Sequence, residues 1–277
     1  MKITQLRNAT VVLEFGSVVL LVDPMLSRQG ALPPLKWLVR SRRRNPLVEM
    51  PEGASALLDR VTHVLITHCQ RGHFDHLDRA GIQFLRERRL PTLCMPHDAK
   101  WLAGRGLDAQ VLTPSNFFGG TITPVACTHG LGLVGSLMEH GSGYFIELPG
   151  EPTVYLAGDT ILTDDLRAGL ARMQPAVSVL PAGGARLDLG GDIIMGAAEV
   201  CEACALISGI VIANHLEALD HCPTTRLQLE TLARESKVAE RLRIPRDGES
   251  YTFARFSGST FASSGERAAG SQSPLST

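Results

Sequence analysis

The feature that most constrains this chain is a series of short apolar runs that end at a histidine or an aspartate. Short runs rich in Val and Ile are typical of buried β-strands. His68 follows the run Val61–Thr67, Asp159 follows the run Val154–Ala157, and a third run ends just before His215. If these strands share a sheet edge, the polar side chains at their ends meet in one cleft, where function is usually placed.

The remaining pattern predicts a mixed α/β (α+β) protein. Hairpin-like strand pairs alternate with strand–helix units, which favours two sheets with helices outside them. The expected strands are Ile3–Leu6, Val11–Phe15, Val18–Val22, Val61–Thr67, Thr92–Met95, Thr121–Cys127, Tyr144–Leu148, Val154–Ala157, Val177–Leu180 and Ile210–Ala213. The expected helices are Leu77–Arg89, Ala99–Ala103, Thr163–Arg172, Met195–Leu206 and Thr224–Ser236.

Composition narrows the class of protein. The chain has 277 residues and a formal net charge of −1, so no global field recruits nucleic acid or an anionic membrane. Its apolar runs are strand-sized, and the start lacks the pattern of a signal peptide, which predicts a cytoplasmic protein without membrane spans. We expect one domain over residues 1–256 and a mobile tail rich in Ser, Gly and Ala over 257–277.

The clustered residue types suit a metal centre. Neutral imidazole and carboxylate bind Zn²⁺ and similar ions without help from cysteine. The chain has nine histidines, and the segment His73-Phe74-Asp75-His76 concentrates two of them around an aspartate. Cys201 and Cys204 have metal-site spacing, but they lie on one face of an expected helix, where free cysteine usually belongs to the core.

Several motifs in this order resemble the metallo-β-lactamase fold superfamily, whose hallmark is Thr-His-X-His-X-Asp-His after a strand. The branch that contains L-ascorbate-6-phosphate lactonase and related metal-dependent hydrolases is the most similar. The matching segments are Val22-Asp23-Pro24-Met25-Leu26, Arg44-Asn45-Pro46-Leu47-Val48, Thr67-His68, His73-Phe74-Asp75-His76-Leu77-Asp78, Ala157-Gly158-Asp159-Thr160 and His215-Leu216-Glu217-Ala218-Leu219-Asp220-His221-Cys222. The resemblance implies a four-layer αββα sandwich of two mixed β-sheets flanked by helices.

The motif departs from the family pattern after His68, and two alignments compete. Without a gap, Gln70 and Gly72 replace a histidine and the aspartate, which leaves a crippled site. With an insertion, His73 and its neighbours fill the motif. Pro91, which opens the next strand, lies 15 residues after His76 and 18 after His73. The shorter spacing fits the family and favours the insertion, but it leaves the reach of His68 open.

By resemblance, the chain holds one or two ions, with Zn²⁺ expected first and Mn²⁺ or Fe²⁺ as alternatives. The implied ligands are His73 and His129, joined by His68 if it reaches, for one ion; Asp75, His76 and His215 for the other; and Asp159 as the bridge. A metal-bound hydroxide would then cleave a lactone, ester or phosphoester of a small molecule. Asp75 and His221 are the candidate catalytic residues, His221 as an acid or a substrate contact, although a capped surface histidine fits its position equally.

Other functions stay open at this point. The alternatives are a phosphodiesterase or nuclease of the same fold, and a non-catalytic metal- or ligand-binding protein with a degenerate site. A small-molecule substrate is the expected partner, with no nucleic acid and no membrane, and a homo-oligomer is compatible with the sequence.

Several residues outside the cluster have a structural interpretation, in some cases beside a functional one. His63, His97 and His140 are expected to be structural or surface residues. Asp23 is expected to cap a turn and, by resemblance, to orient a metal ligand. The basic run Arg40–Arg44 is either a solvated loop or a phosphate contact. The pair Gly183-Gly184 marks either a turn or a close backbone approach to substrate.

Overall fold

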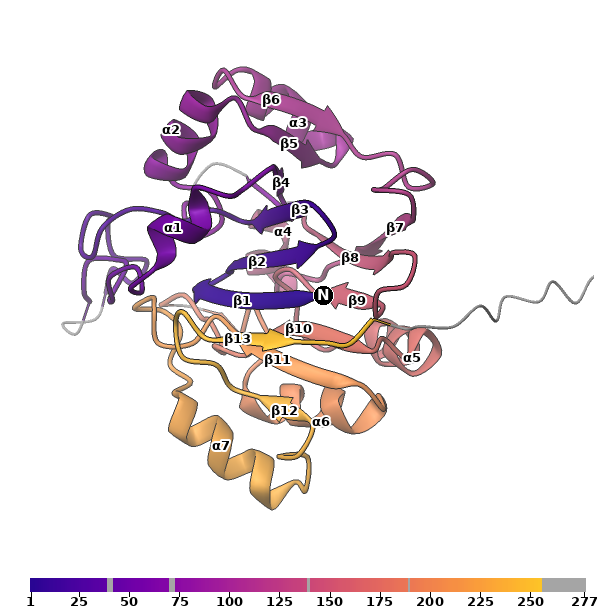
Figure 1. Ribbon diagram of the computed structural model, residues 1–277. Helices are drawn as coiled ribbons and strands as arrows, with labels where there is room; N and C mark the ends of the chain where they lie inside the picture. Colours follow the sequence, from indigo (N-terminus) through magenta and orange to yellow (C-terminus); the bar gives the residue numbers. More distant parts are fainter. Residues whose placement is uncertain (39–41, 70–72, 139, 189, 256–277) are drawn as a thin grey trace, which may run out of the picture.

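The computed structural model describes residues 1–38, 42–69, 73–138, 140–188 and 190–255. In these ranges the chain forms two mixed β-sheets with helices on both outer faces (Figure 1). The strands are β1 (Lys2–Arg7), β2 (Thr10–Phe15), β3 (Val18–Val22), β4 (His63–Leu65), β5 (Pro91–Cys94), β6 (Asp108–Val111), β7 (Thr121–Ala126), β8 (Ser142–Glu147), β9 (Val154–Leu156), β10 (Val177–Pro181), β11 (Ile210–Asn214), β12 (Leu242–Arg243) and β13 (Ser250–Thr252). The helices are α1 (Ala54–Leu58), α2 (Arg79–Arg88), α3 (Pro96–Ala103), α4 (Gly132–Leu137), α5 (Asp164–Met173), α6 (Ala197–Leu206) and α7 (Arg226–Glu235).

The first sheet has the order β13-β1-β2-β3-β4-β5-β6. Its opening strands form an antiparallel meander, and Gly16 supplies the positive φ of +55° that the tight turn between β2 and β3 requires. From β3 to β6 the strands run parallel. Parallel pairs need crossover segments, and α1, α2 and α3 lie in those crossovers.

The second sheet has the order β12-β11-β10-β9-β8-β7. β7, β8 and β9 are antiparallel, whereas β9 to β12 run parallel. The crossovers of the parallel part contain α5, α6 and α7. Thr163 and Thr225 cap α5 and α7 by accepting hydrogen bonds from backbone N–H groups of the first turn, which fixes where these helices begin.

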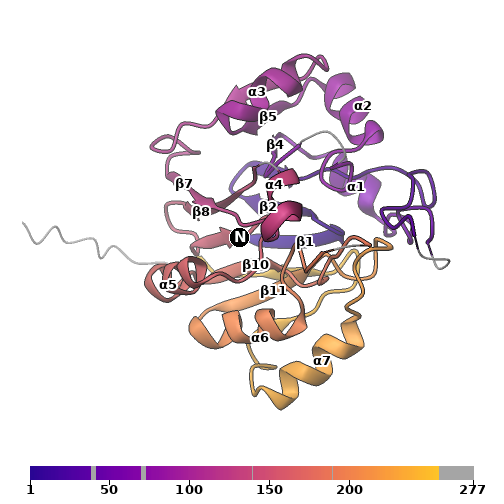
Figure 2. The same cartoon turned by 180° about the vertical axis from the view of Figure 1, so that it is seen from behind.

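Three apolar clusters separate the four layers. The inner faces of the two sheets pack against each other through residues such as Leu13, Leu20 and Ile146. The outer face of the first sheet packs on α1, α2 and α3, and that of the second sheet packs on α5, α6 and α7. Figure 2 shows the same two helical layers from behind. The predicted four-layer αββα sandwich is confirmed.

The sequence predicted most of the apolar elements but missed β6, β12, β13, α1 and α4. β6 is largely exposed, β12 has two residues, and α4 is glycine-containing, so none of them carries a clear apolar period. Cys201 and Cys204 are buried in the core beneath the second sheet, as expected. The predicted tail over 257–277 lies outside the described residues, as do Arg40 and Ser41 of the basic run. Within the described ranges, no helix is long and apolar enough to cross a membrane.

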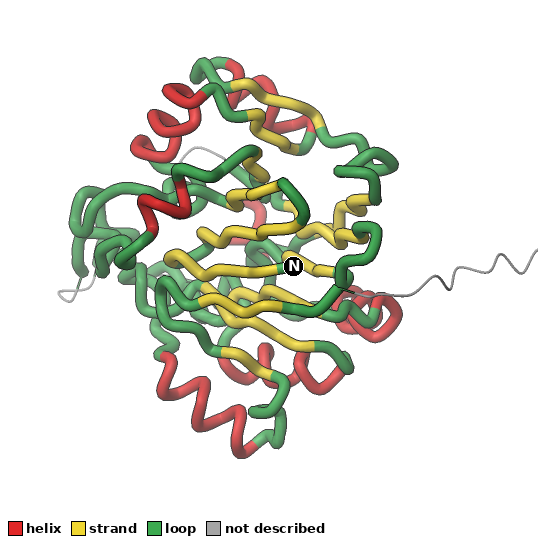
Figure 3. The backbone as a smooth tube through the Cα atoms, viewed as in Figure 1, coloured by secondary structure: helices red, strands yellow, loops and turns green. Residues whose placement is uncertain are grey.

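The long loops gather at one end of the sandwich. Figure 3 shows these loops, in green, at the left-hand end, toward which β3 and β11 point. Arg7 anchors one of them: its side chain is buried and donates hydrogen bonds to the carbonyls of Met25, Ser27 and Val48, at 2.7, 2.8 and 3.0 Å. The loop after β3 is therefore fixed by a buried cation against backbone carbonyls.

Candidate metal centre

Polar side chains from both sheets meet at the loop-rich end of the sandwich. His68 lies just beyond β4, while Asp159 and His215 follow β9 and β11 of the other sheet. His129 follows the edge strand β7, and His73 comes from the segment before α2. Parallel strands present their carboxyl ends at one edge, so residues far apart in the sequence converge there.

The first group of potential ligands is made of imidazoles. One ring nitrogen each from His68, His73 and His129 lies within 4.8 Å of the other two. The ring centroids of His68 and His73 are 4.9 Å apart, and that of His129 lies 5.5 Å from each. The sequence left open whether His68 extends to the metal site. The structure places His68 in this group.

The second group surrounds the Asp159 carboxylate. His215 Nε2 lies 2.9 Å from Asp159 Oδ1, and His76 Nε2 lies 3.2 Å from Asp159 Oδ2. Asp75 Oδ2 lies 3.9 Å from His76 Nε2. His129 Nε2 also reaches to 3.7 Å of Asp159 Oδ2, so this carboxylate contacts residues of both groups. Asp159 is therefore the carboxylate that a bridging role would require, within reach of both groups.

Buried polar atoms facing this centre lack partners, which tests whether a metal fits. Among the described residues, several buried nitrogen and oxygen atoms have no hydrogen-bond partner: His68 Nε2, His73 Nδ1, His76 Nε2, Asp159 Oδ1 and His215 Nε2. The 2.9 Å approach of His215 to Asp159 is close but lacks hydrogen-bond geometry. Unsatisfied buried groups are costly, and a shared cation would satisfy all of them. The donor set fits a metal of the zinc class.

The opposite nitrogens of the rings are held by the surrounding protein. Asp23 Oδ2 lies 2.9 Å from His76 Nδ1, and Asn214 Oδ1 lies 2.9 Å from His215 Nδ1. The Ile193 carbonyl lies 2.7 Å from His129 Nδ1. Such contacts fix the tautomer of a ligating imidazole and turn its free nitrogen toward the metal.

Thr67 links Asp23 to His68. Its Oγ1 donates to Asp23 Oδ2 at 2.6 Å and lies 3.1 Å from His68 Nδ1, while its N–H donates to Asp23 Oδ1 at 2.8 Å. The predicted role of Asp23 in orienting a ligand agrees with its contact to His76. The roles of Thr67, Asn214 and Ile193 were missed. Thr67 and Asn214 each precede a clustered histidine, which is a usable signal, whereas a backbone carbonyl leaves no trace in the sequence.

Two residues of the centre have strained backbones. Asp23 has a φ of 47° and His215 has a φ of 58°, both in the left-handed region that non-glycine residues rarely adopt. Gly183 packs against the second of them, because an added Cβ would lie 2.3 Å from the His215 carbonyl oxygen. Such strain persists where the surroundings over-determine the geometry, and it is common at functional sites. Gly183 is therefore needed for close backbone packing behind His215.

The charge states of Asp159 and His68 suit metal binding, whereas a metal ion would have to displace a proton from His76. Burial lowers the pKa of His76, but the carboxylates of Asp159, Asp23 and Asp75 outweigh it and hold that pKa well above its usual value. Burial raises the pKa of the Asp159 carboxyl, but the imidazoles of His76 and His215 outweigh it and hold that pKa well below its usual value. Burial holds the pKa of His68 well below its usual value, and His76 adds to the effect. An ionised carboxylate and a neutral imidazole are the forms that ligate metals.

His221 and Asp75 lie beside this centre. His221 is 4% exposed, so its interpretation as a surface histidine is wrong. Burial lowers the pKa of its imidazole, against the opposing charge of Asp75. Asp75 is also buried, and its backbone carbonyl accepts a hydrogen bond from Asn8 Nδ2 at 3.2 Å. Both candidate catalytic residues are thus within the electrostatic reach of the cluster.

The alternative alignment concerns residues that the structure does not describe. Gln70, Arg71 and Gly72 lie outside the described ranges. The structure does bring His73 and His76 to the cluster together with His68, which is the arrangement that the insertion alignment predicts. His63 is half-buried against the Phe118 ring, as expected for a structural histidine.

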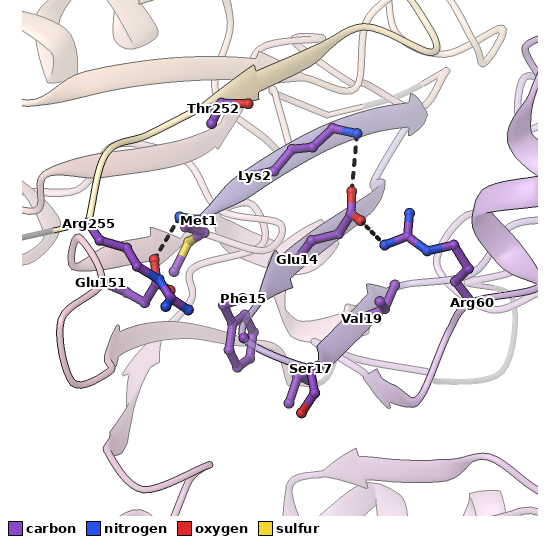
Figure 4. Close-up of a pocket in the computed structure, with 12 residues that line it drawn as sticks. Met1, Lys2, Glu14, Phe15, Ser17, Val19, Arg60, Glu151, Thr252 and Arg255 are labelled. Atoms are coloured by element: carbon purple, nitrogen blue, oxygen red, sulfur yellow. Dashed lines mark hydrogen bonds and ion pairs between the residues drawn. The ribbon is translucent and has the colours of Figure 1, made fainter.

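The other end of the strands has a pocket of a different kind. It covers about 530 Å³ around the turn between β2 and β3. Figure 4 shows that its charged side chains face one another. Glu14 pairs with Lys2 at 3.2 Å and with Arg60 at 2.6 Å, and Glu151 pairs with Arg255 at 2.6 Å. Each carboxylate of this pocket is thus paired with at least one cation.

A comparison with known families agrees with this geometry. Residues 19–215 match the family model described as the beta-lactamase superfamily domain. The chain belongs to the metallo-β-lactamase superfamily. The UPF0173 protein YddR of Bacillus subtilis is 33% identical over 258 residues, which cover 91% of this chain and all of that protein. Further curated relatives are named metal-dependent hydrolases.

Two solved structures extend the comparison. An isothiocyanate hydrolase from Delia radicum gut bacteria is 32% identical, with a TM-score of 0.81, and the match covers 92% of this chain and 100% of that one. A possible metal-dependent hydrolase from Veillonella parvula is 28% identical, with a TM-score of 0.83, and the match covers 91% and 99%. The protein is a metal-dependent hydrolase of the metallo-β-lactamase fold.

Proposed function

We propose that the protein hydrolyses a small electrophilic molecule, a lactone, ester or phosphoester, at a centre of one or two zinc-class ions. The supporting observation is the set of buried, unpartnered ligand atoms that converge from both sheets. The proposed ligands are His68, His73 and His129 for one ion, Asp75, His76 and His215 for the other, and Asp159 between them. Mn²⁺ or Fe²⁺ would suit the same nitrogen and oxygen donors.

The chain's own residues would bind, orient and shield the reacting groups. When bound, the metal supplies Lewis acidity and lowers the pKa of water. Asp23 and Asn214 hold the imidazoles of His76 and His215 in place, so the centre reorganises little during reaction. Asp75 would accept a hydrogen bond from the nucleophile. The neutral His221 imidazole offers one N–H donor to the substrate or leaving group.

Burial of the centre favours a small substrate. His68, His76 and Asp159 are at most 3% exposed, whereas His73 is only half-buried. The substrate would therefore approach from the side of His73. A polymer backbone would not reach such ligands without a groove, and the near-neutral net charge of −1 gives it no electrostatic attraction. A small-molecule partner, with neither nucleic acid nor membrane, is accordingly the proposal.

An isothiocyanate is the second candidate substrate. Its central carbon is electrophilic, like a lactone carbonyl carbon, and would require the same nucleophile. The similarity to the isothiocyanate hydrolase, 32% identical over the whole length of that chain, supports this alternative. The two candidates share the metal centre and differ in what surrounds the leaving group.

A substrate panel tests the proposal. Protein loaded with Zn²⁺ would be assayed against lactones, carboxylic esters, phosphomonoesters, small phosphodiesters, isothiocyanates and polynucleotides, with Asp159→Asn as the inactive control. We expect turnover of a lactone, an ester, a phosphoester or an isothiocyanate that Asp159→Asn abolishes. Turnover confined to polynucleotides would support the nuclease alternative. Metal-loaded protein that hydrolyses none of them would support a degenerate binding protein.

A further inference from the structure

A second cluster of potential metal ligands lies outside the centre described above. His97, Asp98 and His140 place one ligand atom each within 4.8 Å of the others. His140 Nε2 lies 3.1 Å from Asp98 Oδ1, and His97 Nε2 lies 3.4 Å from Asp98 Oδ2. The two imidazole rings are 3.7 Å apart between centroids. Both rings thus direct a nitrogen at one carboxylate.

Two parts of the chain build this cluster. His97 and Asp98 lie in the first turn of α3, which begins at Pro96 directly after β5. His140 lies just before β8 of the other sheet. His97 and His140, which were expected to be structural or surface residues, are partly exposed, and the fold brings them together. No local pattern indicated this, because 42 residues separate Asp98 from His140 across the sheets.

Asp98 is the unusual member of the cluster. It is 2% exposed, and its Oδ2 has no hydrogen bond of good geometry in the part of the chain that the structure describes, although His97 Nε2 lies 3.4 Å away and the Cys69 thiol contacts the carboxylate. A buried carboxylate oxygen without a hydrogen bond of good geometry is costly, and a cation is the group that would compensate it best. The side chains of His97 and His140 are 36% and 33% exposed, which leaves a route for an ion from solvent.

The neighbouring thiols do not complete the ligand set in the metal-free state. Burial, followed by the charge of Asp98, raises the pKa of Cys69 far above its usual value. The same two causes raise the pKa of Cys94 to about 11. Neither sulfur belongs to the group of ligand atoms that lie within 4.8 Å of one another. Two imidazoles and one carboxylate therefore remain, with coordination positions left for water or an external ligand.

We propose that His97, Asp98 and His140 form an additional binding site for a divalent zinc-class ion. The pairing of two neutral imidazoles with a carboxylate is the donor set that Zn²⁺ accepts when it keeps an open position. The ion would compensate the negative charge on the Asp98 oxygen. It would also take the place of protons on the two adjacent imidazoles, which would repel each other when protonated.

An ion at this site would affect the surroundings of His68, in the neighbouring metal centre, through the backbone. Gly141 follows His140, and a Cβ built on it would lie 3.9 Å from His68 Cγ. Cys69 follows His68 directly and lies within the electrostatic reach of Asp98. An ion at the additional site would tie α3 to the segment that packs on His68. It would therefore order the surroundings of that ligand without touching substrate.

Metal titration of the full chain tests the proposal. Protein whose main centre is loaded would be titrated with Zn²⁺ against a chromophoric chelator, and then with Co²⁺ while its visible absorption is followed. We expect one further equivalent, weaker than the first ones. His97→Ala should weaken the binding of this further equivalent at least about tenfold. Loss of a residue that only orients a metal ligand already costs about that much, and His97 would be a ligand itself. His97 is the primary variant because it is the more exposed imidazole.

Two controls separate this site from the main centre. His63→Ala removes a half-buried histidine elsewhere and should leave the further equivalent unchanged. His76→Ala should remove metal from the main centre and leave the additional equivalent in place. His140→Ala should act as His97→Ala does. If the unaltered protein takes up no further equivalent, or if His97→Ala and His140→Ala bind it as tightly as His63→Ala, the proposal is wrong.

Discussion

The two ends of the sandwich differ in whether their polar side chains are paired within the protein. At one end, His76 Nε2 and Asp159 Oδ1 are buried and, among the residues described, have no hydrogen-bond partner. At the other end, Glu14 and Glu151 each meet a cation in a pocket open to solvent (Figure 4). The carboxylates of that pocket are thus paired with cations, whereas the imidazole and carboxylate atoms at the first end converge without hydrogen bonds.

This difference indicates where binding energy is available. A pocket whose charges are already paired offers a ligand little, because an exposed ion pair contributes at most about 1 kcal/mol and is screened by salt. Buried ligand atoms without partners carry a desolvation cost that a bound cation removes. The convergence of several metal-ligating atoms without hydrogen-bond partners, rather than cavity volume, marks the candidate functional end of this protein.

The largest effect is expected from His76→Ala. This variant removes a ligand atom from the functional end, so metal content should fall and kcat/KM should drop on the order of 10²- to 10³-fold or more, as when one preorganised electrostatic group is lost. Elemental analysis and steady-state kinetics measure both quantities. His63→Ala is the matched control, and equal losses in the two variants would break the comparison.

Arg7→Met should have the next largest effect, on stability. Arg7 donates to three backbone carbonyls in a buried position, and its loss leaves them without a donor. We expect the free energy of unfolding to fall by about 2–4 kcal/mol, measured by urea denaturation. Arg60→Met, at the exposed end, should change it far less. A neutral Arg7→Met would show that the loop after β3 does not depend on this cation.

Asp23→Asn should weaken the centre without emptying it. The variant replaces the carboxylate beside His76 Nδ1 by an amide, which holds the imidazole less firmly and lowers its basicity. Loss of such a contact typically costs about 10- to 100-fold in metal affinity. Competition with a chelator gives that affinity. An unchanged value would mean that Thr67 and packing alone orient His76.

Glu14→Gln should have the smallest effect. Glu14 contacts Lys2 and Arg60, whose side chains are 42% and 59% exposed. We expect a change in the free energy of unfolding below about 0.5 kcal/mol, and unaltered turnover. Thermal unfolding and the same substrate assay measure both. A large loss of activity would show that the pocket at this end takes part in function.

The fold was predictable to the extent that its elements are apolar. β3, β10 and β11 are buried runs of Val, Ile and Leu, and α5 and α7 begin at threonine caps, so both types of element are visible in the sequence. β6 and β12 are not, because they are formed by pairing with a neighbouring strand rather than by an apolar pattern of their own.

The metal centre was predictable because its residues follow such strands. Asp159 and His215 are placed by β9 and β11, and the resemblance to the family ordered them along the chain. The ring contacts through Ile193 and the pairing of His97 with His140 depend on how two sheets face each other. Nothing local in the sequence encodes that distance, so these features appear only in the folded molecule.

The most direct test of the metal centre is anomalous X-ray diffraction at the zinc edge, on crystals of protein purified without added metal. The account predicts one or two strong anomalous peaks among His68, His73, His76, His129, Asp159 and His215, with the Nε2 atoms of His76 and His215 turned toward them. A structure without anomalous density there, in which His76 and His215 instead form ordinary hydrogen bonds to Asp159, would contradict it.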